Sequence, residues 1–312
     1  MHNFPKKWLA VHVTGPTWLR NSHPWFAGLS VLALALTGCD GSTAMQSKQG
    51  PPSSSLQTVP PASSSTIEAE ISPFAELDTY LAGRVGQVTA AVFDATTNRT
   101  WTFNPGIVQD TASIVKVEIM GAALREALDQ GQPLPEAEAS LMPSMIENSD
   151  NASATALLSD IGGPSALASF DQSIGMAHTI PSNLAFIPGT SLPGWGLTTT
   201  SALDEVTLIS KFAYPNTTLS TNSRDYGLSL MEQVEADQDW GVSAGVPAGT
   251  TVALKNGWLS LGSNDWQVNS IGWVDGAGRN YVLAVLTTGS PNEMYGIDTV
   301  ETVARSMFAK LG

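Results

Sequence analysis

Ser113 and Lys116 form the only S-x-x-K sequence in this chain of 312 residues, and their types and spacing suit nucleophilic chemistry. A helix is expected to begin here, after Asp110, and helical residues three positions apart face the same way. The lysine amine can therefore reach the serine hydroxyl. Free N–H groups and the dipole at a helix start stabilise an oxyanion, while burial beside another cation favours the neutral amine that a base requires. The alternative is a surface serine and lysine on an ordinary helix.

A second group of polar residues, Ser149–Asn151, reads Ser-Asp-Asn. It lies between an expected helix at 141–146 and another that starts at 152. Ser, Asp and Asn are the side chains most favoured as helix N-caps. By itself, this group predicts only a capping turn.

A third group, Lys255–Gly257, lies late in a β-rich run that begins at Thr251. One interpretation is a turn at the end of a strand. The other is a cation and a glycine that permits close approach, both on an edge strand that lines a cleft.

Together, the three groups indicate more than each does alone, because S-x-x-K, S-D-N and K-(T/S)-G, in that order, are typical of penicillin-binding proteins and serine β-lactamases. With Met145–Asn151 and Thr198–Thr200 included, the chain resembles the class A serine β-lactamase family over most of residues 73–312. It is most similar to a group of exported actinobacterial serine hydrolases that carry Lys-Asn-Gly-Trp.

This resemblance implies a catalytic role for each matching residue. Ser113 would be the acylated nucleophile and Lys116 its general base. Ser149 would relay a proton to the leaving nitrogen, and Lys255 would keep that relay polarised and attract a substrate carboxylate.

It also implies binding roles. Asn151 would hold Lys116 and the substrate amide, and the backbone N–H groups of Ser113 and Trp258 would form the oxyanion hole. Asn256 replaces the family's Thr or Ser but keeps an amide donor for a carboxylate, and Gly257 permits close approach.

The chain departs from class A β-lactamases in the region that should hold the Ω-loop glutamate, which activates the deacylating water. Between Ile161 and Leu197 the only acidic residue is Asp171, in a helical stretch. The strand at 267–274 also lacks the arginine that often anchors the carboxylate. We therefore expect slow deacylation. His178, the only histidine after Cys39, is expected to have a loop or packing role.

The order of expected elements is a helix, two strands, an all-helical insert, three strands and a final helix. This order predicts an α+β fold in which strands from both chain ends form one five-stranded antiparallel sheet, packed with helices beside an all-helical lobe. A ligand cleft is expected between the sheet and the lobe. The expected strands lie at 88–93, 101–103, 251–254, 268–274 and 281–287.

The first 38 residues are interpreted as a lipoprotein signal peptide. An acid-free basic segment with Lys6, Lys7 and Arg20 precedes an apolar run, 25–38, that is shorter than the roughly 20 residues of a membrane span. The run ends next to Cys39 in Leu-Thr-Gly-Cys, which resembles a bacterial lipobox. Two acyl chains on Cys39 would anchor the protein stably; the alternative is an ordinary signal peptide with a stray cysteine.

Residues 39–72 comprise the lipidated Cys39 and a tether rich in Ser and Pro, which cannot form a core. Residues 73–312 then form the hydrolase domain. The expected location is the outer face of the bacterial cytoplasmic membrane, reached through the lipid anchor.

Composition excludes several other classes of protein. The formal net charge of −14 argues against nucleic acid as a partner. A single cysteine excludes a disulfide framework, and scarce histidines argue against a zinc site. No metal or organic cofactor is implied, and a monomer is expected.

Three functions remain open, each with a small-molecule or peptidoglycan-derived substrate or ligand. The protein is a β-lactamase with an atypical deacylation route, a D-Ala peptidase or amidase of the cell wall, or a binding or sensor module without turnover. Retention of all three groups favours an enzyme, because a pure binder needs neither Lys116 nor Ser149.

Overall fold

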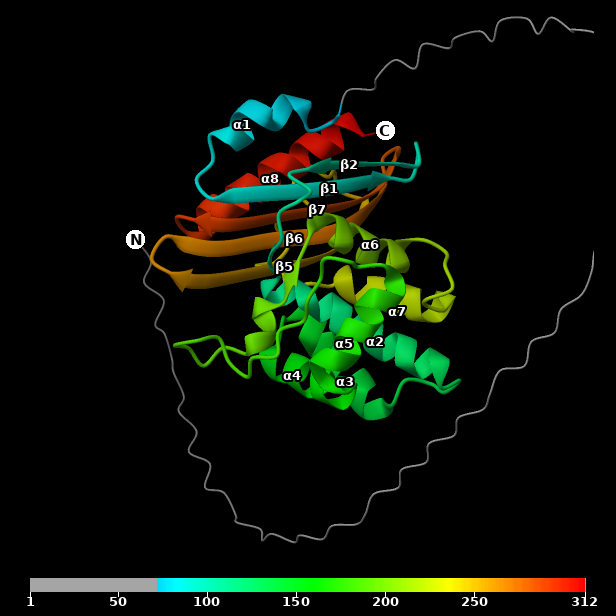
Figure 1. Cartoon of the computed structure of the whole chain (residues 1–312). Helices are drawn as coiled ribbons and strands as arrows, with labels where there is room; N and C mark the ends of the chain where they lie inside the picture. Colours follow the sequence, from blue (N-terminus) through cyan, green and yellow to red (C-terminus); the bar gives the residue numbers. More distant parts are fainter. Residues whose placement is uncertain (1–71, 312) are drawn as a thin grey trace, which may run out of the picture. The chain divides into compact units, whose positions relative to one another are not determined.

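The computed structural model describes residues 72–311. The expected signal peptide, Cys39 and all but the last residue of the expected tether lie outside the described residues. Five antiparallel strands form one sheet in the order β2-β1-β7-β6-β5 (Figure 1). The strands are β1 (Gln87–Asp94), β2 (Arg99–Phe103), β5 (Thr251–Gly262), β6 (Asp265–Gly276) and β7 (Arg279–Ser290). Because β1 pairs with β7, the sheet joins both ends of the domain, and the predicted α+β architecture is confirmed.

Helices cover both faces of this sheet. On one face lie α1 (Asp78–Ala82) and the long α8 (Glu293–Lys310) (Figure 1). Alternate side chains of β7, such as Leu283 and Val285, pack in the core beneath them, while Val282 and Ala284 face the core shared with the helical lobe. The period of two in β-strands thus divides one apolar run between two cores.

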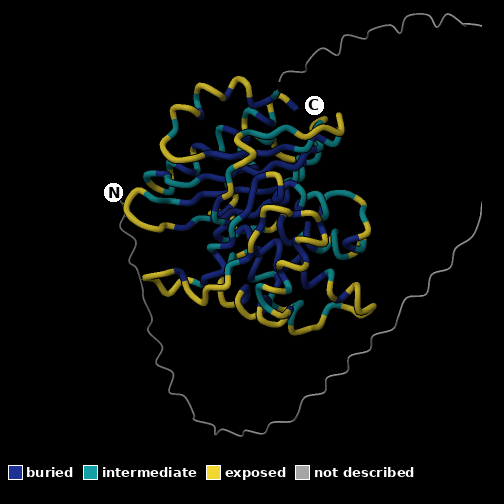
Figure 2. Tube along the Cα trace, viewed as in Figure 1, coloured by how far each residue is buried: buried dark blue, intermediate teal, exposed yellow. Residues whose placement is uncertain are grey.

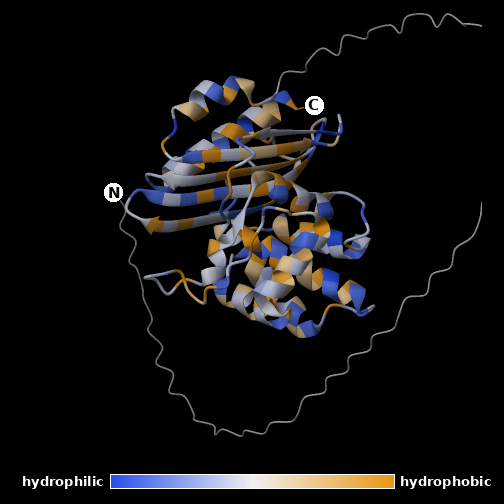
Figure 3. Cartoon of the chain, in the orientation of Figure 1, coloured by the Kyte–Doolittle hydropathy of each residue, from blue (hydrophilic) through white to orange (hydrophobic). Residues whose placement is uncertain are grey.

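The lobe on the other face is built around α2, with five further helices among the described residues. Most of α2 is buried, and Figure 2 shows that buried segments run from the sheet into the middle of the lobe. Figure 3 shows hydrophobic and hydrophilic positions alternating along these ribbons, as expected of amphipathic helices. The helices are α2 (Val115–Asp129), α3 (Glu136–Glu147), α4 (Asn151–Asp160), α5 (Gly163–Ile174), α6 (Ala202–Ala213) and α7 (Thr221–Met231).

Two leucines in these helices, Leu128 and Leu203, are exposed. Each lies within the last or first two residues of its helix. Among residues 72–311, no helix combines the length and apolarity needed to cross a bilayer.

Candidate active site

Ser113 lies in a tight turn, η2 (Ala112–Ile114), that leads directly into α2. The preceding Ala112 has a φ of 49°, a left-handed conformation that is unfavourable for a residue with a Cβ. Two contacts hold the turn: Thr111 N donates to Thr198 O at 2.8 Å, and Asn269 Nδ2 donates to Thr111 O at 3.0 Å. Backbone strain maintained by its surroundings is characteristic of functional sites.

Gly257 allows β5 to lie directly against this turn. A Cβ at this position would meet Ser113 N at 2.7 Å, Thr111 O at 2.8 Å and Ile114 N at 2.9 Å. These are backbone atoms, so a Cβ here would force the strand or the turn to shift. The glycine therefore sets the distance between the edge strand and the start of α2.

Lys116 joins the first two groups of polar residues. Its Nζ lies 2.9 Å from Ser113 Oγ, 2.9 Å from Ser149 Oγ, 2.6 Å from Ser149 O and 2.9 Å from Asn151 Oδ1. The side chain is 0 % exposed. The structure thus brings Lys116 together with residues up to 35 positions away in sequence.

Burial, and to a lesser extent the charge of Lys255, lowers the pKa of Lys116 to about 6, with Asp150 acting in the opposite direction. The amine is therefore mostly neutral at pH 7. A neutral amine has one lone pair and two N–H donors. The lone pair can accept the Ser113 proton while the two donors bind oxygens of Ser149 and Asn151.

The Ser-Asp-Asn segment is both a helix cap and part of the site. Asp150 caps α4 by accepting a hydrogen bond from Ser153 N at 2.6 Å, and hydrogen bonds from Ser153 lower its pKa. Ser149 adopts a positive φ of 55°, and its oxygens meet Lys116. The capping interpretation and the functional one therefore apply to different residues of the same turn.

Lys255 is fully buried within β5, and burial lowers its pKa to about 7. Within the described residues its Nζ has one hydrogen bond, to Asn256 O at 3.1 Å. Any effect of Lys255 on the Ser149 relay would therefore act without a direct hydrogen bond between the two residues. The contribution of Lys255 to the site is its charge, which acts on Lys116.

Asn256 is placed differently from what the resemblance implied. Its Nδ2 donates to Gln238 O at 2.7 Å and to Trp240 O at 2.8 Å, which uses both amide hydrogens. Side chains alternate along a strand, so Asn256 faces away from the side on which Gly257 meets Ser113. It anchors the segment before β5 and is not free to bind a substrate carboxylate.

Two adjoining cavities open at Ser113, one of about 60 Å³ and one of about 390 Å³. Both are lined by Ser113, Asn151, Leu192, Trp258 and Leu259. The larger cavity also reaches Ser149, and the smaller one reaches Trp195. The structure therefore places Trp258 and Trp195 at the nucleophile.

Trp195 belongs to the segment between Ile161 and Leu197, which contains no counterpart of the family's deacylating glutamate. It lies in η3 (Gly194–Leu197), with its ring centre 5.0 Å from Lys116 Nζ and its Nε1 donating to Thr155 Oγ1 at 3.0 Å. No Asp or Glu is among the described residues that line either cavity.

Asp171 and His178 lie outside both cavities. Asp171 is buried with Glu118 and Glu205 between α2, α5 and α6. Burial, and then the charge of Asp204, raises the pKa of Asp171 to about 7, and burial raises that of Glu205 to about 8. His178 is largely exposed and pairs with Asp204. We call Glu118, Asp171, Asp204 and Glu205 the buried acid cluster; the sequence indicated it only as acidic positions within apolar helical patterns.

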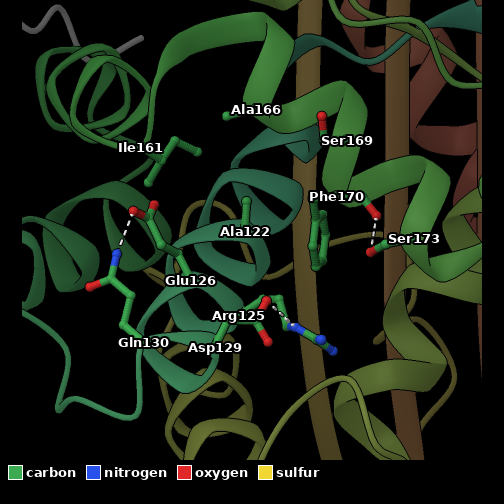
Figure 4. Close-up of a pocket in the computed structure, with 10 residues that line it drawn as sticks. All are labelled: Ala122, Arg125, Glu126, Asp129, Gln130, Ile161, Ala166, Ser169, Phe170 and Ser173. Carbon is green, nitrogen blue, oxygen red and sulfur yellow. Dashed lines mark hydrogen bonds and ion pairs between the residues drawn. The ribbon is translucent and has the colours of Figure 1, made fainter. Parts of the chain in front are cut away.

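A further cavity, of about 440 Å³, lies between α2 and α5 (Figure 4). Four of its polar side chains form pairs: Arg125 with Asp129, and Gln130 with Glu126. It shares no lining residue with the cavities at Ser113.

A serine at the start of a helix, with a buried lysine amine 2.9 Å from its hydroxyl in an α+β fold, is an arrangement suited to acyl transfer by an active-serine hydrolase. The family model for the Beta-lactamase enzyme family matches residues 139–311, so the chain belongs to this family. No curated protein matched the sequence.

Solved class A β-lactamases share the fold. An ancestral class A β-lactamase is 22 % identical, with a TM-score of 0.65 over 76 % of this chain and 99 % of that one. The TLA-1 extended-spectrum β-lactamase is 18 % identical, with a TM-score of 0.68 over 76 % of this chain and 97 % of its own.

Proposed function

We propose that this protein is a serine acyl hydrolase that cleaves an amide or lactam through an acyl-serine intermediate at Ser113. The observation that carries the proposal is the buried Lys116 amine, 2.9 Å from Ser113 Oγ and with a pKa of about 6. A neutral amine at this distance is suited to general-base catalysis at neutral pH. The substrate class is a β-lactam or a peptidoglycan-derived amide.

In the acylation step, Lys116 takes the proton of Ser113 as Oγ attacks the carbonyl carbon. The N–H groups of Ser113 and Trp258 would stabilise the resulting oxyanion. Ser149 Oγ, 2.9 Å from Lys116 Nζ, then passes a proton to the leaving nitrogen and regains one from Lys116. The C–N bond breaks, and the acyl group stays on Ser113.

Deacylation is the slow step of this proposal. Hydrolysis of the ester requires an activated water, and Trp195 stands beside Lys116 where an acid would serve. General-base assistance is worth about 10²–10⁴ in rate. The same observation favours a D-Ala peptidase or amidase, or a sensor that stays acylated, over a rapid β-lactamase.

We also propose that Cys39 carries the lipid anchor and that residues 40–72 are the tether to the outer face of the bacterial cytoplasmic membrane. The Leu-Thr-Gly-Cys sequence after an apolar run supports this proposal. The enzyme would then act on cell-wall or external amides.

The test is covalent labelling followed by intact-mass analysis. A fluorophosphonate and a penicillin should each add one group to the protein, and Ser113→Ala should abolish both additions with an unchanged thermal melt. Labelling of another residue, or no labelling by either reagent, would contradict the proposal. Ser260→Ala is a matched control, because Ser260 lines the larger cavity without contacting Lys116.

A further inference from the structure

One wall of the two cavities at Ser113 is apolar, whereas Asn151 and Ser149 contribute polar groups beside the nucleophile. Leu192, Trp258 and Leu259 line both cavities, and Trp266 extends the wall of the larger one. The Trp258 ring packs on Trp240, with centroids 6.0 Å apart. This wall is therefore held in place by a second aromatic residue.

The cavities also lack a side chain that could neutralise an ion. Among the described residues that line them, none is Asp, Glu, Lys, Arg or His. The nearby lysines, Lys116 and Lys255, are each fully buried and hydrogen-bonded. The amide of Asn256 is bound to two backbone carbonyls. A charged substituent placed against the apolar wall would lose its hydration without gaining an oppositely charged partner.

The segment between α5 and η3 carries apolar residues that remain exposed. Leu192, which lines both cavities, is 41 % exposed, and Phe186, which pairs with the cavity residue Pro193 in a β-bridge, is 62 % exposed. Ile187 from the same segment is buried and lines the smaller cavity. An apolar group entering from this side would remove apolar surface from water, which favours binding.

We propose that the cavity at Ser113 selects substrates whose acyl group is apolar and uncharged, aromatic or branched aliphatic, and rejects an acyl group that bears a carboxylate. Leu192, Trp258 and Trp266 are the residues that determine this specificity. The inference rests on the proposed function, because it concerns the acyl group that Ser113 receives.

The test compares two penicillins that differ by a single carboxylate on the acyl side chain, benzylpenicillin and carbenicillin. Rates of Ser113 acylation would be measured by intact-mass analysis over time. We expect benzylpenicillin to react at least about 10-fold faster, since the added charge is desolvated without a partner. Equal rates, or a faster reaction with carbenicillin, would overturn the inference.

Leu192→Lys supplies the missing cation, and Leu192→Gln is the matched control that removes apolar surface without adding charge. The lysine variant should lower the benzylpenicillin-to-carbenicillin rate ratio by about 10-fold relative to the glutamine variant, because the new cation meets the carboxylate. An identical ratio in both variants would overturn the inference. Both variants should fold normally, because the position is partly exposed.

Failure of this inference can be told apart from failure of the proposed function. If an uncharged fluorophosphonate labels Ser113 and neither penicillin does, the inference fails and the acyl-serine mechanism stands. If none of the three reagents labels Ser113, both fail.

Discussion

The Lys116 amine lies 2.9 Å from Ser113 Oγ in a position where the lysine is shielded from water. Burial and the charge of Lys255 lower the pKa of this amine to about 6. An amine with this pKa is mostly deprotonated at neutral pH. Its distance from Ser113 Oγ and its lowered pKa therefore both support a role as the general base.

Replacing Lys116 should remove the general base. Lys116→Ala should slow fluorophosphonate labelling of Ser113 by about 10²–10⁴, the usual contribution of such a base. In the unaltered protein, the labelling rate should rise with pH through about 6, because only the deprotonated amine accepts a proton. Labelling rates of the variant and of the unaltered protein, measured across roughly pH 4.5–8, would check both the loss of rate and its pH dependence. Lys211→Ala is a control in a different helix, and a pH-independent rate would contradict the assignment.

The close approach at Gly257 should not tolerate a methyl group. Gly257→Ala places a Cβ within 2.7 Å of Ser113 N, so the strand or the turn must shift. Such overpacking typically costs about 1–3 kcal/mol, and the displaced serine should label more slowly. Gly262→Ala is the matched control on the same strand, because a Cβ there meets nothing within 4 Å. Urea unfolding and labelling rates would show whether the two variants differ.

Deacylation should be slow enough for the acyl-enzyme to accumulate. A penicillin adduct on Ser113 should persist through many minutes of stopped-time mass spectrometry, while steady-state nitrocefin hydrolysis stays slow. The reason is that none of the cavity-lining residues within 72–311 is acidic, since loss of a general base costs about 10²–10⁴ in rate. Rapid turnover without a detectable adduct would mean that another group activates the water.

The contribution of the buried acid cluster to stability should fall as the pH rises from about 4 to 8. In this cluster, burial raises the pKa of Glu205 to about 8 and that of Asp171 to about 7. These carboxyl groups therefore hold protons in the folded state that the unfolded chain has released in this range, so they contribute less to the free energy of unfolding as the pH rises.

Glu205→Gln should reduce this dependence, because an amide cannot ionise. At pH 8 the variant should be more stable than the unaltered protein by on the order of 1 kcal/mol or more. Glu136→Gln, at an exposed position in the first turn of α3, is the control. Thermal melts between about pH 5 and 9 would measure the effect, and parallel curves for both variants would contradict it.

The lipid anchor should depend on Cys39. Cys39→Ala should release the protein from membranes into the soluble fraction, because no acyl chain can then be attached to the sulfur. Fractionation of the expressing cells, with Ser54→Ala as a control in the tether, is the measurement. Unchanged membrane association would contradict the lipoprotein interpretation.

The sequence by itself determined the fold class and the candidate residues of the site. Strands expected at both ends of the domain, with helices between them, predicted one sheet, and the pairing of β1 with β7 joins its two halves. The spacing of Ser113 and Lys116 placed both on one side of a helix start, because i and i+3 positions are neighbours there. These features depend on contacts between residues close in sequence.

Only the tertiary structure decided the rest. The direction of the Asn256 amide depends on the segment that packs against β5, and the pKa of Lys116 depends on burial and on Lys255, which is distant in sequence. Glu118 and Glu205 look like ordinary helical acids until α2, α5 and α6 bring them together. Such electrostatic effects depend on distance and burial, which are set by how distant segments pack and not by local spacing.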